Sequence, residues 1–108
     1  MRVYIAGPYT KGDVVVNTRT AILAGQAVLA RGHTPFVPHL THFWHFLVPG
    51  EYEQWLALDL GWLEVSEALI RLPGESSGAD REVERAHALG IPVFYNVHDF
   101  LEANVRTT

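Results

Sequence analysis

The sequence contains no cysteine. This absence excludes disulfides, thiolate nucleophiles and cysteine-ligated zinc, and it fits a reducing compartment, so we expect the chain to be cytoplasmic. Long hydrophobic runs are also missing: no stretch reaches the roughly 18 apolar residues that a transmembrane helix needs. The first residues read as a strand and not as a signal peptide. We therefore expect neither a membrane span nor a secretion signal.

Positive charge is scarce. The chain has 8 Lys and Arg residues against 12 Asp and Glu, a formal net charge of −4, and its basic residues are scattered. A nucleic-acid polymer is normally held by clustered basic residues, so no such partner is expected. A small nucleotide remains compatible with this composition, because helix N-termini bind phosphate without a basic patch.

What the chain does have is enough apolar material for a core. It is 108 residues long, and 48% of these are hydrophobic. This size is typical of one domain, so residues 1–108 are expected to fold as a single unit.

Strand-like and helix-like segments alternate along the chain. Hydrophobic periodicity and Gly or Pro breakers predict strands over residues 2–6, 34–38, 67–72 and 92–95. They predict helices over residues 13–31, 51–65, 79–89 and 98–103. The segment 39–50 is rich in aromatic residues and histidine but has no clear period, and no element is predicted there.

This alternation predicts an α/β fold, a small doubly wound parallel sheet of the Rossmann or flavodoxin-like type. We expect four to five strands in the order 2-1-3-4, with helices on both faces and the second strand at an edge. The winding then reverses between the first and third strands, which opens a crevice at their carboxyl ends. The loops that border this crevice are residues 7–12 and 73–78.

Two acidic residues interrupt apolar helix faces. Asp59 lies in the middle of a stripe formed by Tyr52, Trp55, Leu56, Trp62 and Leu63. Burial of an unpaired carboxylate costs several kcal/mol, so Asp59 should border a cavity, have a partner or carry a raised pKa. A functional role is favoured over a structural one, in which Asp59 accepts a hydrogen bond from backbone or Trp N–H.

Glu82 lies on the side of the next helix that carries Ala79 and Ala86. With a helix start near residue 79, Glu82 falls in the first turn, where the helix dipole favours the ionised form. We therefore expect an anionic nucleophile. The structural alternative, an acidic residue that merely stabilises the helix start, is equally compatible with this position.

Two loops offer backbone and hydroxyl groups to a ligand. Ser76, Ser77 and Gly78 precede a helix, an arrangement that suits a phosphate or carboxylate but is also a common N-cap. The loop from Gly7 to Gly12 has neither the ending of a P-loop nor the spacing of a dinucleotide fingerprint. ATP hydrolysis and NAD chemistry are therefore disfavoured.

His39, His42 and His45 suggest a metal site, but residues six apart on a regular helix diverge by more than a right angle. No carboxylate lies near them in sequence, so a surface or subunit-contact role is favoured and no metal is expected. The aromatic segment from Phe43 to Phe46 fits either a lid over an aromatic ligand or a subunit contact.

Four motifs occur in the order Val3-Tyr4-Ile5-Ala6-Gly7-Pro8, Asp59-Leu60-Gly61-Trp62-Leu63, residues 76–86, and Leu89-Gly90-Ile91-Pro92-Val93. Together they resemble the nucleoside 2-deoxyribosyltransferase superfamily, including the 2'-deoxynucleoside 5'-monophosphate N-glycosidases. The run Ser-x-Gly-x-x-x-Glu, ending at Glu82, is the most specific part of this likeness.

The resemblance implies an enzyme that cleaves the N-glycosidic bond of a 2'-deoxynucleoside or its 5'-monophosphate without a cofactor. Glu82 would be the nucleophile that attacks C1', Tyr4 would position it, and Asp59 would exchange a proton with the leaving base. The predicted substrate- or phosphate-binding residues are Gly7, Pro8, Tyr9, Ser76, Ser77 and Gly78. The resemblance also implies a small-molecule nucleoside or nucleotide partner and a homodimer or higher homo-oligomer.

Two other interpretations remain open at the level of sequence: a non-catalytic nucleotide-binding or sensing module, and an oligomerisation domain that uses the aromatic segment. Fold alone does not separate them. The identity of the base, the presence of a 5'-phosphate and the acceptor, water or a second base, also remain open.

Overall fold

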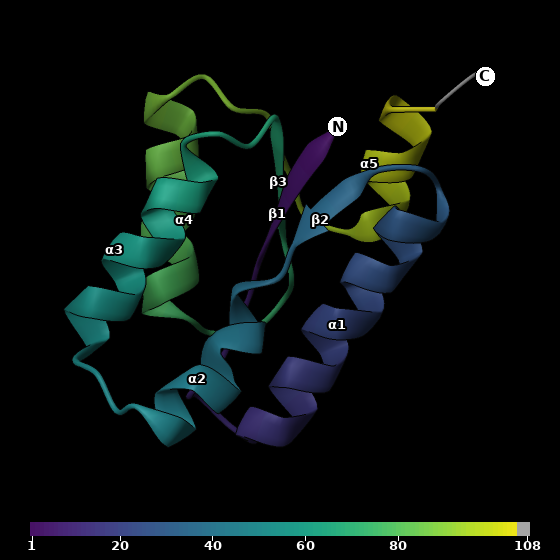
Figure 1. Ribbon diagram of the computed structural model, residues 1–108. Helices are drawn as coiled ribbons and strands as arrows, with labels where there is room; N and C mark the ends of the chain where they lie inside the picture. Colours follow the sequence, from purple (N-terminus) through teal and green to yellow (C-terminus); the bar gives the residue numbers. More distant parts are fainter. Residues whose placement is uncertain (106–108) are drawn as a thin grey trace.

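A computed structural model describes residues 1–105 as a four-stranded sheet with helices on both faces (Figure 1). The strands are β1 (Arg2–Ala6), β2 (Thr34–Phe36), β3 (Ala68–Arg71) and β4 (Val93–Phe94). The helices are α1 (Val14–Ala30), the 3-10 helix η1 (Pro38–Leu40), α2 (Thr41–Leu47), α3 (Tyr52–Leu63), α4 (Ser77–Ala88) and α5 (Val97–Ala103).

All strand pairings are parallel, and the strand order is β2-β1-β3-β4. The predicted fold class, strand order and edge position of β2 are therefore confirmed. β1 is central, pairing with β2 through Tyr4 opposite Phe36 and with β3 through Tyr4 opposite Leu69. Among residues 1–105 no helix is long and apolar enough to cross a membrane.

The two sheet faces carry separate cores, because successive side chains of a strand point to opposite faces. Val3 and Ile5 pack into the cluster on the side of α1 and α5, whereas Tyr4 and Ala6 pack into the cluster on the side of α3 and α4. Figure 1 shows these two helix layers on either side of the sheet. Tyr4 is thereby directed toward the helix that carries Glu82.

Two predictions about elements are wrong. The segment 39–50, for which no element was predicted, forms η1 and α2. Its helix was missed because most apolar side chains of α2 point outward, and the helix has no buried residue to give it a period.

Helix α4 begins at Ser77 and not near residue 79, because the Ser76 side chain caps it by accepting a hydrogen bond from the Ala79 amide at 3.1 Å. Glu82 consequently lies in the second turn, outside the region where the helix dipole acts most strongly. The first-turn argument for an ionised Glu82 therefore fails.

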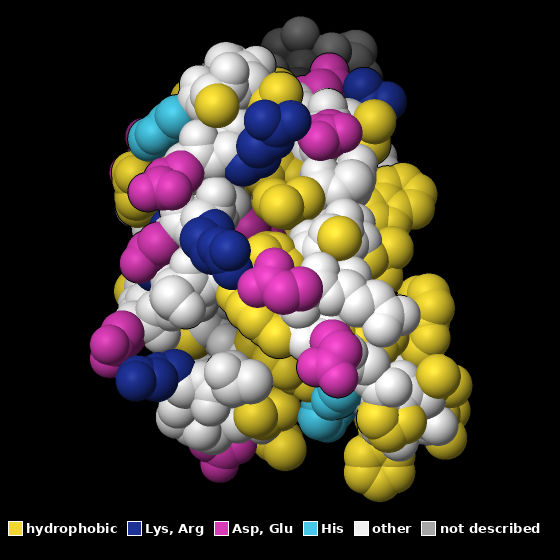
Figure 2. Space-filling view, turned by 90° about the vertical axis from the view of Figure 1, so that its left-hand side faces the viewer, with side chains coloured by type: hydrophobic (Ala, Val, Ile, Leu, Met, Phe, Trp, Pro, Cys, Tyr) yellow, Lys and Arg dark blue, Asp and Glu magenta, His cyan; other side chains and the backbone are white. Residues whose placement is uncertain are grey.

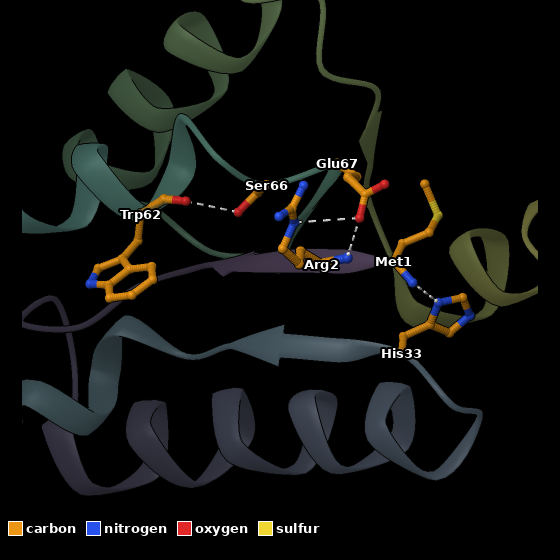
Figure 3. Close-up of polar contacts among 6 residues, drawn as sticks. All are labelled: Met1, Arg2, His33, Trp62, Ser66 and Glu67. Atoms are coloured by element: carbon orange, nitrogen blue, oxygen red, sulfur yellow. Dashed lines mark hydrogen bonds and ion pairs between the residues drawn. The ribbon is translucent and has the colours of Figure 1, made fainter.

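Polar contacts close the end of the sheet where the strands begin (Figure 3). The Arg2 amide donates to Glu67 Oε1 at 2.9 Å, and the N-terminal amine lies 3.2 Å from His33 Nδ1. His33 is buried and also meets the Phe100 ring edge-on. These contacts leave the opposite end of the sheet as the place for a ligand.

Two helical glycines provide a test of packing between α1 and the segment after β2. A Cβ at Gly25 would lie 2.7 Å from Val37 Cγ2, whereas a Cβ at Gly61 would meet no atom within 4 Å. We expect Gly61→Ala to raise the free energy of unfolding by about 0.5–1 kcal/mol through helix propensity. At Gly25 the clash of the new Cβ with Val37 should outweigh the gain in helix propensity. We therefore expect Gly25→Ala to lower the free energy of unfolding by about 1 kcal/mol.

Denaturant unfolding of both variants beside the parent chain measures the two changes. Equal stability of Gly25→Ala and Gly61→Ala would contradict the tight contact between α1 and Val37.

Candidate functional site

A cavity of about 640 Å³ opens at the carboxyl ends of β1 and β3. The loop after β1, the segment η1–α2, one side of α3 and the start of α4 surround it. A Cβ at Gly74 would lie 2.7 Å from the Pro8 ring, so the two predicted loops are in contact. The cavity therefore lies at the crevice that the strand order predicts.

The structure brings most of the predicted site residues to this cavity. Its lining includes seven of the nine predicted residues: Gly7, Tyr9, Asp59, Ser76, Ser77, Gly78 and Glu82. Pro8 and Tyr4 are not among the lining residues. The Pro8 carbonyl instead accepts a hydrogen bond from His39, and Tyr4 is completely buried in the sheet.

Glu82 is 6% exposed and accepts a short hydrogen bond from the Tyr4 hydroxyl. Local geometry explains this contact. Tyr4 points to the α4 side of β1, and the small Ala79 and Ala86, three residues before and four after Glu82, let that face of α4 lie close to the sheet. Burial keeps the Tyr4 pKa well above its usual value, so the hydroxyl retains its proton and donates it.

The pKa of Glu82 is raised to about 7, mainly because burial disfavours its charge. The Tyr4 hydrogen bond and the nearby Arg71 guanidinium act in the opposite direction, and the Asp59 charge raises the pKa further. The helix dipole predicted an anionic Glu82, and with a pKa of about 7 the anion is only part of the population at neutral pH. Near neutral pH the Glu82 side chain is therefore partly protonated and partly ionised.

Asp59 also has a pKa raised to about 7 by burial. Its Oδ1 is one of three buried side-chain atoms without a hydrogen-bond partner in the part of the chain that the structure describes; the others belong to Thr18 and His39. Glu82 receives a hydrogen bond from Tyr4 that favours its ionised form, whereas the buried Asp59 oxygen receives none. The cavity thus holds two carboxyl groups that both titrate near neutral pH.

The opposite end of the cavity suits an anion. Ser77 and Gly78 form the first residues of α4, where backbone N–H groups lack intrahelical partners. Lys11 lines the same cavity, and its Nζ lies 3.9 Å from Glu75 Oε1. The Ser76 hydroxyl, however, caps the helix, so the structural interpretation of that serine also holds.

Aromatic side chains form another part of the wall. Tyr52, Trp55 and Leu56 of α3 line the cavity, and Trp55 Nε1 donates to His45 Nδ1 at 2.8 Å. A flat heteroaromatic ring is the kind of ligand that such a surface accommodates. The apolar stripe that surrounds Asp59 is thus partly a cavity wall and not only a core face.

The three closely spaced histidines do not converge. His39 Nε2 contacts the Pro8 carbonyl at 2.8 Å, His42 Nδ1 contacts the Tyr9 hydroxyl at 2.6 Å, and His45 contacts Trp55. Over residues 1–105 no group of three or more His, Asp or Glu side chains is placed to hold a metal ion.

His39 is a site residue for which the sequence suggested only a metal-ligand or surface-contact role. It is 4% exposed and lines the cavity, and burial lowers its pKa, which keeps the ring neutral. A carbonyl oxygen only accepts, so Nε2 carries the proton and Nδ1 has a free lone pair. Its position directly after the second strand, at the carboxyl edge of the sheet, is the signal that identifies it.

The raised pKa values can be tested without any ligand. A carboxyl group whose pKa is raised by folding stabilises the protein fully below its unfolded pKa, near 4, and this stability is lost as pH rises through about 7. Asp59→Asn and Glu82→Gln should therefore match the parent chain at pH 4 and exceed it at pH 8. Allowing for partial solvent screening, we expect a gain of about 1–2 kcal/mol for each.

Thermal unfolding at both pH values, with Glu84→Gln on the exposed face of α4 as the control, measures this difference. Variants that are no more stable than the parent at pH 8 would show that the two carboxyl groups titrate normally.

Three comparisons with known proteins complete the description of the site. One solved structure with the same fold is that of a 2-deoxyribosyltransferase from the psychrotolerant bacterium Bacillus psychrosaccharolyticus, with a TM-score of 0.65 and 21% sequence identity. The match covers 86% of this chain and 69% of that one. The likeness confirms the expected deoxyribosyltransferase fold.

No curated protein sequence matches the chain. A family model described as a domain of unknown function, DUF7768, matches residues 1–96. The chain therefore belongs to the DUF7768 family.

Proposed function

We propose that this protein cleaves the N-glycosidic bond of a 2'-deoxynucleoside or its 5'-monophosphate through a covalent intermediate on Glu82. The observation that carries the proposal is that two carboxyl groups, Glu82 and Asp59, line one cavity. The Tyr4 hydroxyl donates a hydrogen bond to Glu82. The motifs quoted above and the fold shared with a 2-deoxyribosyltransferase support the same chemistry.

In the first step a Glu82 oxygen attacks C1' of the sugar while the bond from C1' to the base nitrogen breaks. The bonding electrons leave with the base, and the Asp59 carboxyl group transfers its proton to that base. The product is a sugar ester of Glu82, formed through an oxocarbenium-like transition state as in retaining glycosidases.

In the second step the ionised Asp59 takes a proton from water, whose oxygen attacks C1' and restores the Glu82 carboxylate. A second base can replace water, and the outcome is then transfer in place of hydrolysis. The aromatic wall of α3 would hold the base, and the start of α4 with Lys11 would face the 5' position of the sugar.

The decisive experiment incubates the protein with the four deoxynucleosides and their 5'-monophosphates, with and without a free acceptor base, and follows base release by chromatography. We expect Glu82→Gln to lower kcat by about 1,000-fold or more, because it removes the nucleophile while keeping the shape. Asp59→Asn should lower kcat by about 100-fold, because it removes the proton donor.

Glu84→Gln is the matched control, since it makes the same change on the exposed side of α4. Equal base release by the parent chain and Glu82→Gln would refute the assigned nucleophile. Saturable nucleotide binding with no base release from any substrate would favour a binding or sensing module that uses the same cavity.

The free lone pair of His39 yields a separate prediction about binding. A hydroxyl or N–H group of the ligand is expected to donate to Nδ1, because this buried acceptor otherwise lacks a partner. His39→Leu should therefore weaken binding of the best ligand of the panel by about 10-fold. His39→Gln, whose amide offers both a donor and an acceptor, should recover part of this loss.

Isothermal titration calorimetry measures these affinities, and thermal unfolding checks that each variant is folded. Unchanged affinity of a folded His39→Leu variant would show that the ligand does not contact this ring.

A further inference from the structure

Helix α1 exposes an unusually apolar outer face. Of its 17 residues only Arg19 is charged. Five large apolar side chains of this helix are 41–73% exposed: Val15, Val16, Ile22, Leu23 and Leu29. By contrast, Figure 2 shows acidic and basic side chains interspersed over the side of the molecule formed by α3 and α4, where Arg85 and Glu64 form an ion pair at 3.1 Å.

The exposed apolar residues of α1 follow a regular spacing. They come in adjacent pairs seven residues apart, at 15–16, 22–23 and 29–30, and Ala30 completes the third pair. Residues seven apart lie on the same side of a helix, so the three pairs form one continuous strip, called here the α1 strip. A seven-residue apolar repeat is the pattern by which one helix packs along another.

Within residues 1–105 no other segment covers this strip. The inner face of α1, formed by Ala21, Ala24, Gly25 and Val28, is buried against the sheet, and the strip lies on the other side of the helix. An exposed surface of this kind, apolar except for Arg19 and Gln26, typically marks a contact with another molecule.

The order of residues in the strip identifies the partner. Four pairs of exposed positions are symmetric about the midpoint between Ile22 and Leu23: 22 and 23, 19 and 26, 16 and 29, and 15 and 30. Thr20 is also exposed, but its counterpart Gly25 is buried. A second α1 that runs antiparallel therefore places Ile22 opposite Leu23 and Val16 opposite Leu29. This self-complementarity is what an interface with twofold symmetry requires.

Charge favours the same arrangement. In the antiparallel register Arg19 faces Gln26 of the other copy, and the two Arg19 side chains are separated by about 10 Å along the helix axis. A parallel pair would place both arginines side by side. The chain carries a net charge of −4, and α1 has no acidic residue, so two copies approach most easily through this helix.

We propose that the α1 strip is a homodimer interface, in which the α1 helices of two copies pack antiparallel about a twofold axis near Ile22 and Leu23. Because α1 covers the sheet face opposite α3 and α4, both ligand cavities stay open in this dimer. One helix strip buries less than the roughly 800 Å² per partner of a standard interface, so the dimer is reversible. The proposal does not depend on the reaction proposed above.

Sedimentation velocity from about 5 µM to about 500 µM tests the interface. We expect the parent chain to shift from monomer to dimer over this range, and Leu23→Lys to weaken dimerisation by about 10-fold or more. The matched control is Phe46→Lys on α2, because Phe46 is 76% exposed and equally apolar but lies outside the α1 strip. Loss of the dimer in Phe46→Lys but not in Leu23→Lys, or a parent chain that is monomeric throughout, would overturn the proposal.

The absence of cysteine allows a test of the register. Under mild oxidation Ile22→Cys, close to the twofold axis, should form an intermolecular disulfide. Val16→Cys alone and Leu29→Cys alone should not, because in each case the two equivalent positions are about 20 Å apart. A mixture of these two variants should cross-link as a heterodimer, and cross-linking of Val16→Cys alone would exclude the antiparallel register.

Discussion

The hydrogen bond from the Tyr4 hydroxyl to the Glu82 carboxyl group is the interaction on which the proposed site depends. It joins the central strand to α4 across the core, since both side chains are almost completely buried. Burial alone would drive Glu82 toward its neutral form, and the Tyr4 donor opposes that drive. The competition between these two effects leaves a carboxyl group that is available as a nucleophile near neutral pH.

The same burial separates the roles of two chemically similar groups. Glu82 and Asp59 both have pKa values near 7, mainly because of burial, and the Asp59 charge raises the pKa of Glu82 further. Only Glu82 has a hydrogen-bond donor, Tyr4, so in the proposed reaction Glu82 acts as the carboxylate and Asp59 as the acid. Pairs of carboxyl groups whose surroundings assign them opposite forms are a recurring basis of acid and base catalysis.

Short apolar runs bounded by breakers predicted the strands, and four of the helices were predicted because each buries one face. The alternation of strands with helices predicted the parallel sheet and its strand order. Asp59 and Glu82 were found because each interrupts such a face. Segment 39–50 could not be read in this way, since α2 leaves its aromatic residues exposed. His39 was not assigned to the cavity because its role depends on the Pro8 carbonyl, a contact across 31 residues that spacing does not reveal. The error about the dipole at Glu82 arose from a helix start misplaced by two residues.

The buried polar groups around the cavity lower the stability of the folded chain, and this cost suggests that they serve a function. Two carboxyl groups with raised pKa values, an unpaired Asp59 oxygen and an unpaired His39 nitrogen all weaken a domain that has no disulfide to offset them. Hydrophobic side chains of similar size at these positions would remove this cost. Sequences depart from good core packing chiefly where a ligand or a reaction requires it. Because the departures lie together around a single cavity, they point to one function more strongly than any one of the residues does alone.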